Sequence, residues 1–112
     1  MDHIDVSVII PTYHREAQLL EAIGSVLRQQ GVSFEIIVVD DSAEGSARAA
    51  VASVGDPRLQ YIQRPEPSRG LPARVRNDGA KVARGRYLYF LDDDDLLAMT
   101  AAGSPRIRRL TP

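Results

Sequence analysis

Four consecutive aspartates, Asp92–Asp95, end an apolar run in the segment "YLYFLDDDDLL" at residues 87 to 97. Two unit charges about 6 Å apart repel by about 3 kcal/mol at an effective dielectric near 20, so such a run is costly unless it is solvated or shares a cation. Side chains two residues apart point the same way in an extended chain, which pairs Asp92 with Asp94. Paired carboxylates suit Mn²⁺ or Mg²⁺, ions that also take phosphate oxygens as ligands. The alternative is a solvated acidic turn.

Two further polar clusters follow apolar runs, "PTYHR" at residues 11 to 15 and "DDS" at residues 40 to 42. The carboxylates of Asp40 and Asp41 can accept hydrogen bonds from a nucleobase or a ribose hydroxyl. A helix N-cap or turn formed by Asp41 and Ser42 is the structural alternative. Three arginines, at positions 69, 74 and 76, are placed to pair with diphosphate oxygens, although each alone reads as an ordinary surface arginine.

Predicted strands and helices alternate along the chain, and they position these clusters. Short apolar runs rich in β-branched residues predict strands, and apolar residues at helical spacing predict helices. A proline- and glycine-rich stretch at 64–72 predicts a loop. The predicted strands cover residues 6–10, 34–39, 59–63 and 87–91, and the predicted helices cover 16–30, 47–54 and 73–83.

Strands that alternate with helices, and that are apolar almost throughout, predict an α/β fold. The expected form is a Rossmann-like, mainly parallel sheet with helices on both faces. Ligands of such sheets bind beyond the carboxyl ends of the strands. All three polar clusters follow strands, so we expect them to converge in one crevice.

Composition narrows the classes of function. The 112-residue chain has 14 basic and 15 acidic side chains, with a formal net charge of -1, so no long-range field favours nucleic acid or an anionic membrane. Cysteine is absent, which excludes disulfides, thiolate metal sites and cysteine nucleophiles. The N-terminal "MDHIDVSVII" fits neither a signal peptide nor a spanning helix. We therefore expect a cytoplasmic protein with no membrane span.

Three ordered segments together resemble the nucleotide-sugar-binding, N-terminal half of family 2 glycosyltransferases, which have the GT-A fold. They are "VSVIIPTYHR", "FEIIVVDDS" and "ARVRNDGAKVARGRYLYFLDDDDLL". The resemblance implies a nucleotide-binding group, a base-contacting carboxylate, a donor-side "RNDG" segment and a D-x-D metal pair. The nucleotide-binding group is Pro11, Thr12 and Tyr13, and the base-contacting carboxylate is Asp40 or Asp41. The donor-side segment contributes Arg76 with Asn77 and Gly79. The D-x-D metal pair is Asp92 and Asp94, with Asp93 as a ribose contact.

The same resemblance implies a UDP- or GDP-type nucleotide diphosphate sugar as the donor, and Mn²⁺ or Mg²⁺ as the cofactor. It further implies transfer of the sugar to an acceptor with inversion at the sugar carbon. The family's catalytic base belongs to an acceptor-binding half, so no residue here is assigned as the base. We expect residues 1–97 to form the donor-binding half and residues 98–112 to form an atypical, loosely docked tail.

Two alternatives remain at this point. In the first, the domain is catalytically incompetent and acts as a nucleotide-binding or oligomerising interaction module, which buries an incomplete sheet edge against another chain. The second is a receiver-type phosphoacceptor, since acidic residues at strand ends can hold Mg²⁺ there too. No lysine follows a later strand, which disfavours the second.

Overall fold

A computed structural model describes residues 4–66, 68, 71–99 and 105–109. The strands are β1 (Val6–Thr12), β2 (Phe34–Asp40), β3 (Leu59–Gln63), β4 (Tyr87–Phe90), β5 (Asp95–Met99) and β6 (Pro105–Arg109). The helices are α1 (Glu16–Leu27), α2 (Arg48–Val54) and α3 (Pro72–Val82).

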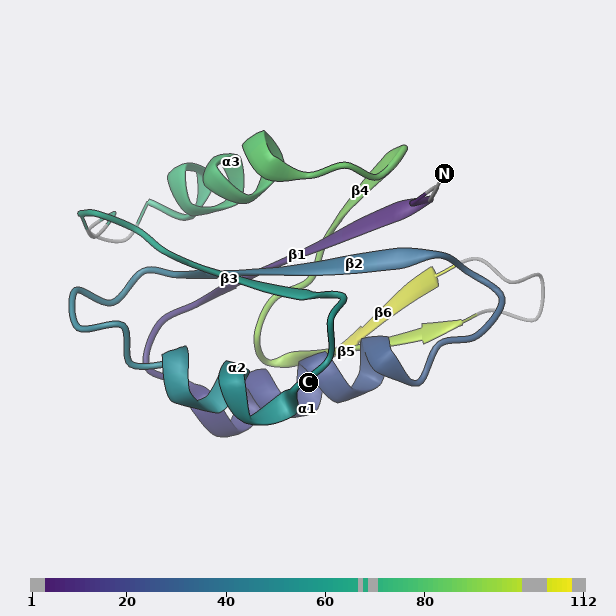
Figure 1. The fold of residues 1–112 in the computed structure, drawn as a ribbon, viewed down its shortest axis with the longest axis horizontal. Coiled ribbons are helices and arrows are strands. Elements are labelled where there is room, and N and C mark those ends of the chain that lie inside the picture. The colour runs from purple at the N-terminus through teal and green to yellow at the C-terminus, as the bar shows by residue number, and fades with distance from the viewer. Residues whose placement is uncertain (1–3, 67, 69–70, 100–104, 110–112) are drawn as a thin grey trace.

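Four strands form a parallel sheet in the order β3-β2-β1-β4. Helices α1 and α2 cover one face of this sheet, and α3 covers the other (Figure 1). The predicted α/β architecture, with a parallel sheet between two helical layers, is confirmed.

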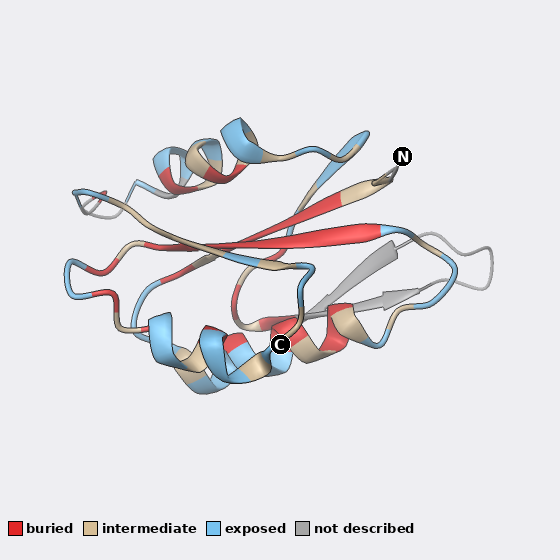
Figure 2. Cartoon of the chain, in the orientation of Figure 1, coloured by how far each residue is buried: buried red, intermediate tan, exposed pale blue. Residues whose placement is uncertain are grey.

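The core follows from the alternation of side chains along the central strands. Val8 and Ile10 of β1 point to the α1 side, where they pack with Leu19 and Ile23. Ile9 points the other way and packs with Val75 of α3. Because both faces are covered, every residue of β2 is buried, as the red ribbon in Figure 2 shows.

The parallel register brings the carboxyl ends of the strands to one edge. Thr12 at the end of β1 is registered with Asp40 at the end of β2. On the other side of β1, Ile9 is registered with Phe90, two residues before the first aspartate of the acidic run. The predicted convergence of polar clusters from distant parts of the sequence is therefore correct.

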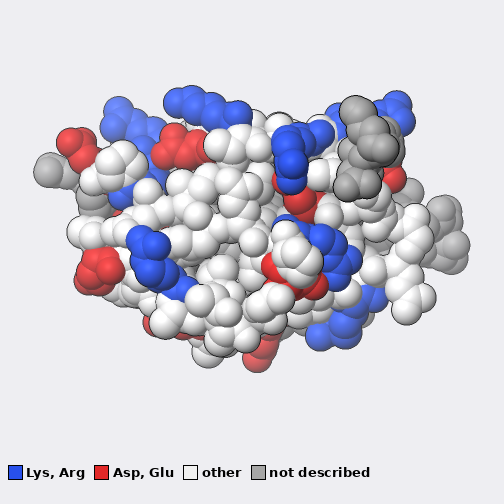
Figure 3. Space-filling model, in the orientation of Figure 1, with Lys and Arg blue, Asp and Glu red and all other residues white. Residues whose placement is uncertain are grey.

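Charged side chains of both signs are interspersed over the face shown in Figure 3, with basic groups along the rim over α3. In the described part of the chain, no helix has the length and apolar character needed to cross a bilayer. Cytoplasmic location stays a prediction.

The C-terminal segment differs from the expectation of a loosely docked tail. Strands β5 and β6 pair in an antiparallel hairpin, in which Leu97 is registered with Ile107. The segment has little apolar periodicity, which hid both strands from sequence-based prediction. The proposed domain boundary at residue 97 falls within β5 and stays a prediction. Helix α1 ends at Leu27, short of the predicted residue 30.

Candidate functional site

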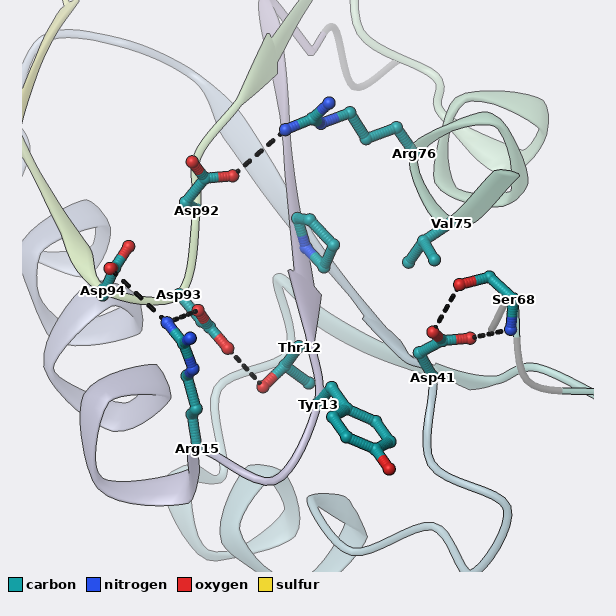
Figure 4. Close-up of a pocket in the computed structure, with 11 residues that line it drawn as sticks. Thr12, Tyr13, Arg15, Asp41, Ser68, Val75, Arg76, Asp92, Asp93 and Asp94 are labelled. Atoms are coloured by element: carbon teal, nitrogen blue, oxygen red, sulfur yellow. Dashed lines mark hydrogen bonds and ion pairs between the residues drawn. The ribbon is translucent and has the colours of Figure 1, made fainter. Parts of the chain in front are cut away.

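A pocket of about 400 Å³ opens at the carboxyl edge of the sheet. Its walls come from the end of β1 and the residues that follow it, the segment after β2, the turn after β4, the start of α3 and the loop before α3 (Figure 4). The lining residues are Pro11, Thr12, Tyr13, Arg15, Asp41, Ser68, Val75, Arg76, Asp92, Asp93 and Asp94.

The acidic run forms a turn at the pocket. The main-chain N–H of Asp95 donates to the carbonyl of Asp92 at 3.0 Å. This turn places carboxylate oxygens of Asp92, Asp94 and Asp95 within 4.8 Å of one another. The predicted Asp92 and Asp94 pair therefore lies together. The extended alternation used to predict it was wrong, because the turn also brings in Asp95.

Asp93 is buried and belongs to the floor of the pocket. It accepts a hydrogen bond from the Thr12 hydroxyl at 3.0 Å, and its other oxygen lies 3.6 Å from Nη1 of Arg15. Burial raises the pKa of Asp93 above its ordinary value, while the Thr12 hydrogen bond and the Arg15 charge oppose that rise. The predicted Thr12 and Asp93 thus meet directly.

Two arginines from other elements compensate the aspartates, although none lies within the acidic run itself. Nη1 of Arg15, just before α1, lies 3.4 Å from Asp94. Nη2 of Arg76, on α3, lies 3.3 Å from Asp92. Sequence reasoning predicted Arg76 but gave Arg15 no role, although Arg15 ends the "PTYHR" cluster that it singled out.

Asp41 forms the opposite wall of the pocket with Ser68 (Figure 4). The Ser68 main-chain N–H and hydroxyl donate to the two carboxylate oxygens of Asp41, at 2.7 Å and 2.6 Å. Nη1 of Arg64 also lies 3.3 Å from Asp41. Ser68 was missed because the predicted loop carries no periodicity that would place its side chains.

Asp40, also predicted to bind nucleotide, does not line the pocket. Its side chain is fully buried, and it accepts hydrogen bonds from the N–H groups of Ser42 and Ala47 and from the Tyr61 hydroxyl. Burial alone would raise its pKa, but these donors outweigh that effect and lower it. The structure therefore corrects the assignment of Asp40, because its carboxylate is fully buried away from the pocket, whereas that of Asp41 lines it.

The remaining predicted residues divide between the pocket wall and the core. Pro11 and the exposed Tyr13 line the pocket as expected. His14 has a positive φ of 53° and pairs with Glu44 at 3.4 Å. Gly79 is buried, and a Cβ there would lie 2.5 Å from Ile9, so this glycine allows close approach of α3 to the sheet.

The parallel α/β sheet, with an acidic pocket at its carboxyl edge, defines a Rossmann-like domain, and solved structures place it within the GT-A fold. Residues 1–349 of S. aureus TarS superpose with a TM-score of 0.75 at 32% identity, covering 84% of this chain and 28% of that one. Its complex with UDP-GlcNAc gives a TM-score of 0.73. The Pyrobaculum calidifontis mannosyltransferase PcManGT, solved with GDP-Man and Mn²⁺, gives 0.72 at 25% identity, covering 86% of this chain and 29% of that one.

The sequence profile of "Glycosyl transferase family 2" matches residues 7–101, and the chain belongs to that family. The succinoglycan biosynthesis protein ExoO of Rhizobium meliloti is 40% identical over 81% of this chain and 26% of its own length. The Escherichia coli glucosyltransferase WfgD is 36% identical over 86% of this chain and 37% of its own. The chain thus spans about a quarter to two fifths of these two relatives.

Proposed function

We propose that this pocket binds a nucleotide diphosphate sugar, with Mn²⁺ or Mg²⁺, as the donor site of a glycosyltransferase. The observation that carries the proposal is that Asp92 and Asp94 lie on one side of a pocket whose opposite wall presents Asp41. A carboxylate oxygen of Asp95 lies within 4.8 Å of theirs. The acidic side suits a cation and its diphosphate, and Asp41 suits the N–H groups of a base.

The donor set fits the proposed metal. All three groups are carboxylates, the hard oxygen ligands that Mn²⁺ and Mg²⁺ take, and their oxygens already lie within 4.8 Å of one another. Asp92 and Asp94 would hold the ion, with Asp95 as a further ligand. When bound, the metal would neutralise charge on the diphosphate and on the leaving nucleotide.

The protein's own groups would orient the donor around that ion. Arg15 and Arg76 flank the aspartates and can donate to phosphate oxygens. Asp93, held by Thr12 on the pocket floor, is a candidate for the ribose hydroxyls. Pro11 and Tyr13 would contact the nucleoside, as the family resemblance implies.

We further propose that the donor sugar is transferred to an acceptor hydroxyl with inversion at the sugar carbon. Hexosyl transfer by two similar proteins supports the first part of this proposal, since WfgD is a glucosyltransferase and PcManGT a mannosyltransferase. None of the described residues is assigned as the base for this step.

Calorimetric titration of UDP and GDP, each with and without Mn²⁺, tests the proposed function. We expect one nucleotide to bind only when Mn²⁺ is present. Asp94→Asn should weaken that binding about tenfold or more, because it removes a charged metal ligand. Asp56→Asn is the matched control, since Asp56 pairs with Arg58 and does not line the pocket. Nucleotide binding indifferent to Mn²⁺, or no binding at all, would overturn the proposal.

A further inference from the structure

Arg64 lies next to the pocket wall that Asp41 forms. It directly follows β3, and its main-chain N–H donates to the carbonyl of Asp40 at 3.0 Å, which continues the pairing of β3 with β2. Because Asp41 follows Asp40, this pairing holds the Arg64 backbone beside the segment that carries Asp41. The Arg64 side chain is 13% exposed, and Arg64 is not among the described residues that line the pocket.

The guanidinium of Arg64 joins the segment after β2, the loop before α3 and α3 itself. Its Nη1 lies 3.3 Å from Oδ1 of Asp41 and donates to the Glu66 carbonyl of the loop at 3.0 Å. Its Nε donates to Oδ2 of Asp78, on α3, at 2.7 Å. A planar guanidinium carries several N–H donors in a fixed arrangement, so it can serve these acceptors at the same time.

The hydrogen bonds of Asp41 are divided unequally between its two oxygens. Among the described residues, Oδ1 accepts from Arg64 and from the Ser68 main-chain N–H, whereas Oδ2 accepts from the Ser68 hydroxyl. Each oxygen of an ionised carboxylate has room for about two hydrogen bonds, so Oδ1 is filled and Oδ2 keeps one acceptor position. That position suits a single ring N–H, which uracil and guanine carry and which cytosine and adenine lack at the corresponding nitrogen.

We propose that Arg64 is a positioning residue for nucleotide recognition. By filling Oδ1 and holding the Asp41 carboxylate between the loop and α3, it fixes the direction in which Oδ2 accepts a hydrogen bond from the ring N–H of a base. This inference rests on the proposed function, in which Asp41 faces the base. Arg64 acts through Asp41 and does not contact the nucleotide itself.

A purely structural role for Arg64 is the alternative, since loss of its guanidinium would also remove a partner of Asp78. The two roles predict different results with different nucleotides. Loss of structural support lowers stability and weakens the binding of all nucleotides alike. Loss of positioning weakens the binding of nucleotides whose base carries the ring N–H and spares the others.

Calorimetric titration in the presence of Mn²⁺, comparing UDP with CDP and GDP with ADP, separates these roles. Arg64→Met should weaken the nucleotide that wild type prefers about tenfold, and should change its counterpart by less than about twofold. Arg64→Lys should recover only part of this loss, and it is the variant to measure if Arg64→Met does not fold. Arg58→Met is the matched control, because Arg58 pairs with Asp56 and does not line the pocket.

A double-mutant cycle with Asp41→Asn tests whether Arg64 acts through Asp41. In the Asp41→Asn background, Arg64→Met should weaken the preferred nucleotide no further. Unchanged binding by the Arg64 variants, an equal loss for both members of a nucleotide pair, or an additive loss in the double variant would overturn the inference. The proposed function would survive each of these outcomes, because wild type would still bind nucleotide with Mn²⁺. A wild type that binds no nucleotide would overturn both.

Discussion

The hydroxyl of Thr12 donates a hydrogen bond to the buried carboxylate of Asp93 over 3.0 Å, joining residues 81 positions apart in the sequence. Thr12 is the last residue of β1, and Asp93 lies in the turn after β4. The contact fixes the acidic turn against the end of a central strand. It therefore supports the carboxylates proposed to hold the metal without using any of them.

Replacing Asp93 with asparagine should change the pH dependence of stability. Burial raises the pKa of Asp93 in the folded state, so its contribution to stability is complete below its ordinary pKa of 3.8 and is lost as the pH rises through the folded value. The asparagine of the Asp93→Asn variant cannot ionise. The free energy of unfolding of the variant should therefore increase relative to that of wild type as the pH rises from 3 to 7. Urea unfolding at several pH values measures this difference, and a constant difference would contradict it.

Gly79→Ala should destabilise the domain by about 1–3 kcal/mol through overpacking. A Cβ at this position would lie 2.5 Å from Ile9 and 3.1 Å from Val39, both of which are fully buried. Gly24→Ala in α1 is the matched control, because its Cβ would meet only the end of the flexible Arg28 side chain, at 3.2 Å. The control should be neutral or up to about 1 kcal/mol more stable, by helix propensity. Equal effects in thermal unfolding would contradict this packing argument.

Much of the fold could be predicted because its signals are local. The continuous apolar runs of β1 and β2 are typical of strands buried on both faces, and the helical spacing of Leu19, Ile23 and Val26 placed α1. The hairpin of β5 and β6 could not be predicted, because its strands show no clear alternation and depend on pairing with each other.

The site was predicted at the level of clusters but not of individual side chains. The rule for parallel sheets brought the acidic run and Asp41 to one edge, where both line the pocket. Two adjacent aspartates at 40 and 41 look alike in sequence, and only the packing around them buries one and exposes the other to the pocket. Arg15 and Ser68 were missed because their roles depend on contacts with distant residues.

Glu35→Gln should destabilise the domain by about 1–3 kcal/mol at pH 7, because the buried carboxylate accepts hydrogen bonds from the Ser7 hydroxyl at 2.6 Å and the Arg84 N–H at 2.7 Å. Although burial opposes ionisation, these bonds and the Arg84 charge lower the pKa of Glu35 below its ordinary 4.5. Its contribution is thus present above pH 4.5 and is lost as the pH falls through the lower folded value.

Chemical denaturation from pH 7 to pH 3 checks this expectation. The difference between wild type and Glu35→Gln should shrink toward the acidic end. The control is Glu21→Gln, which changes an exposed glutamate of α1 and should leave stability nearly unchanged throughout. A difference that grows toward acid would contradict the assigned direction of the pKa shift.

Substitutions at the adjacent residues Asp40 and Asp41 should have different effects, the first mainly on stability and the second mainly on nucleotide binding. Asp40→Asn should cost about 2–3 kcal/mol of stability, because one amide oxygen cannot replace two carboxylate oxygens that accept from Ser42, Ala47 and Tyr61. Asp41→Asn also loses one carboxylate acceptor, for Ser68, but it does so on the wall of an open pocket where water can take that place, so its cost in stability should be smaller. It should nevertheless weaken binding of the nucleotide about tenfold or more, because a charged acceptor for the base is lost.

Urea unfolding and calorimetric titration of UDP and GDP with Mn²⁺, run on both variants, measure the two effects. If Asp40→Asn kept full stability and lost nucleotide binding, the assignment of Asp41 as the ligand-facing carboxylate would be wrong.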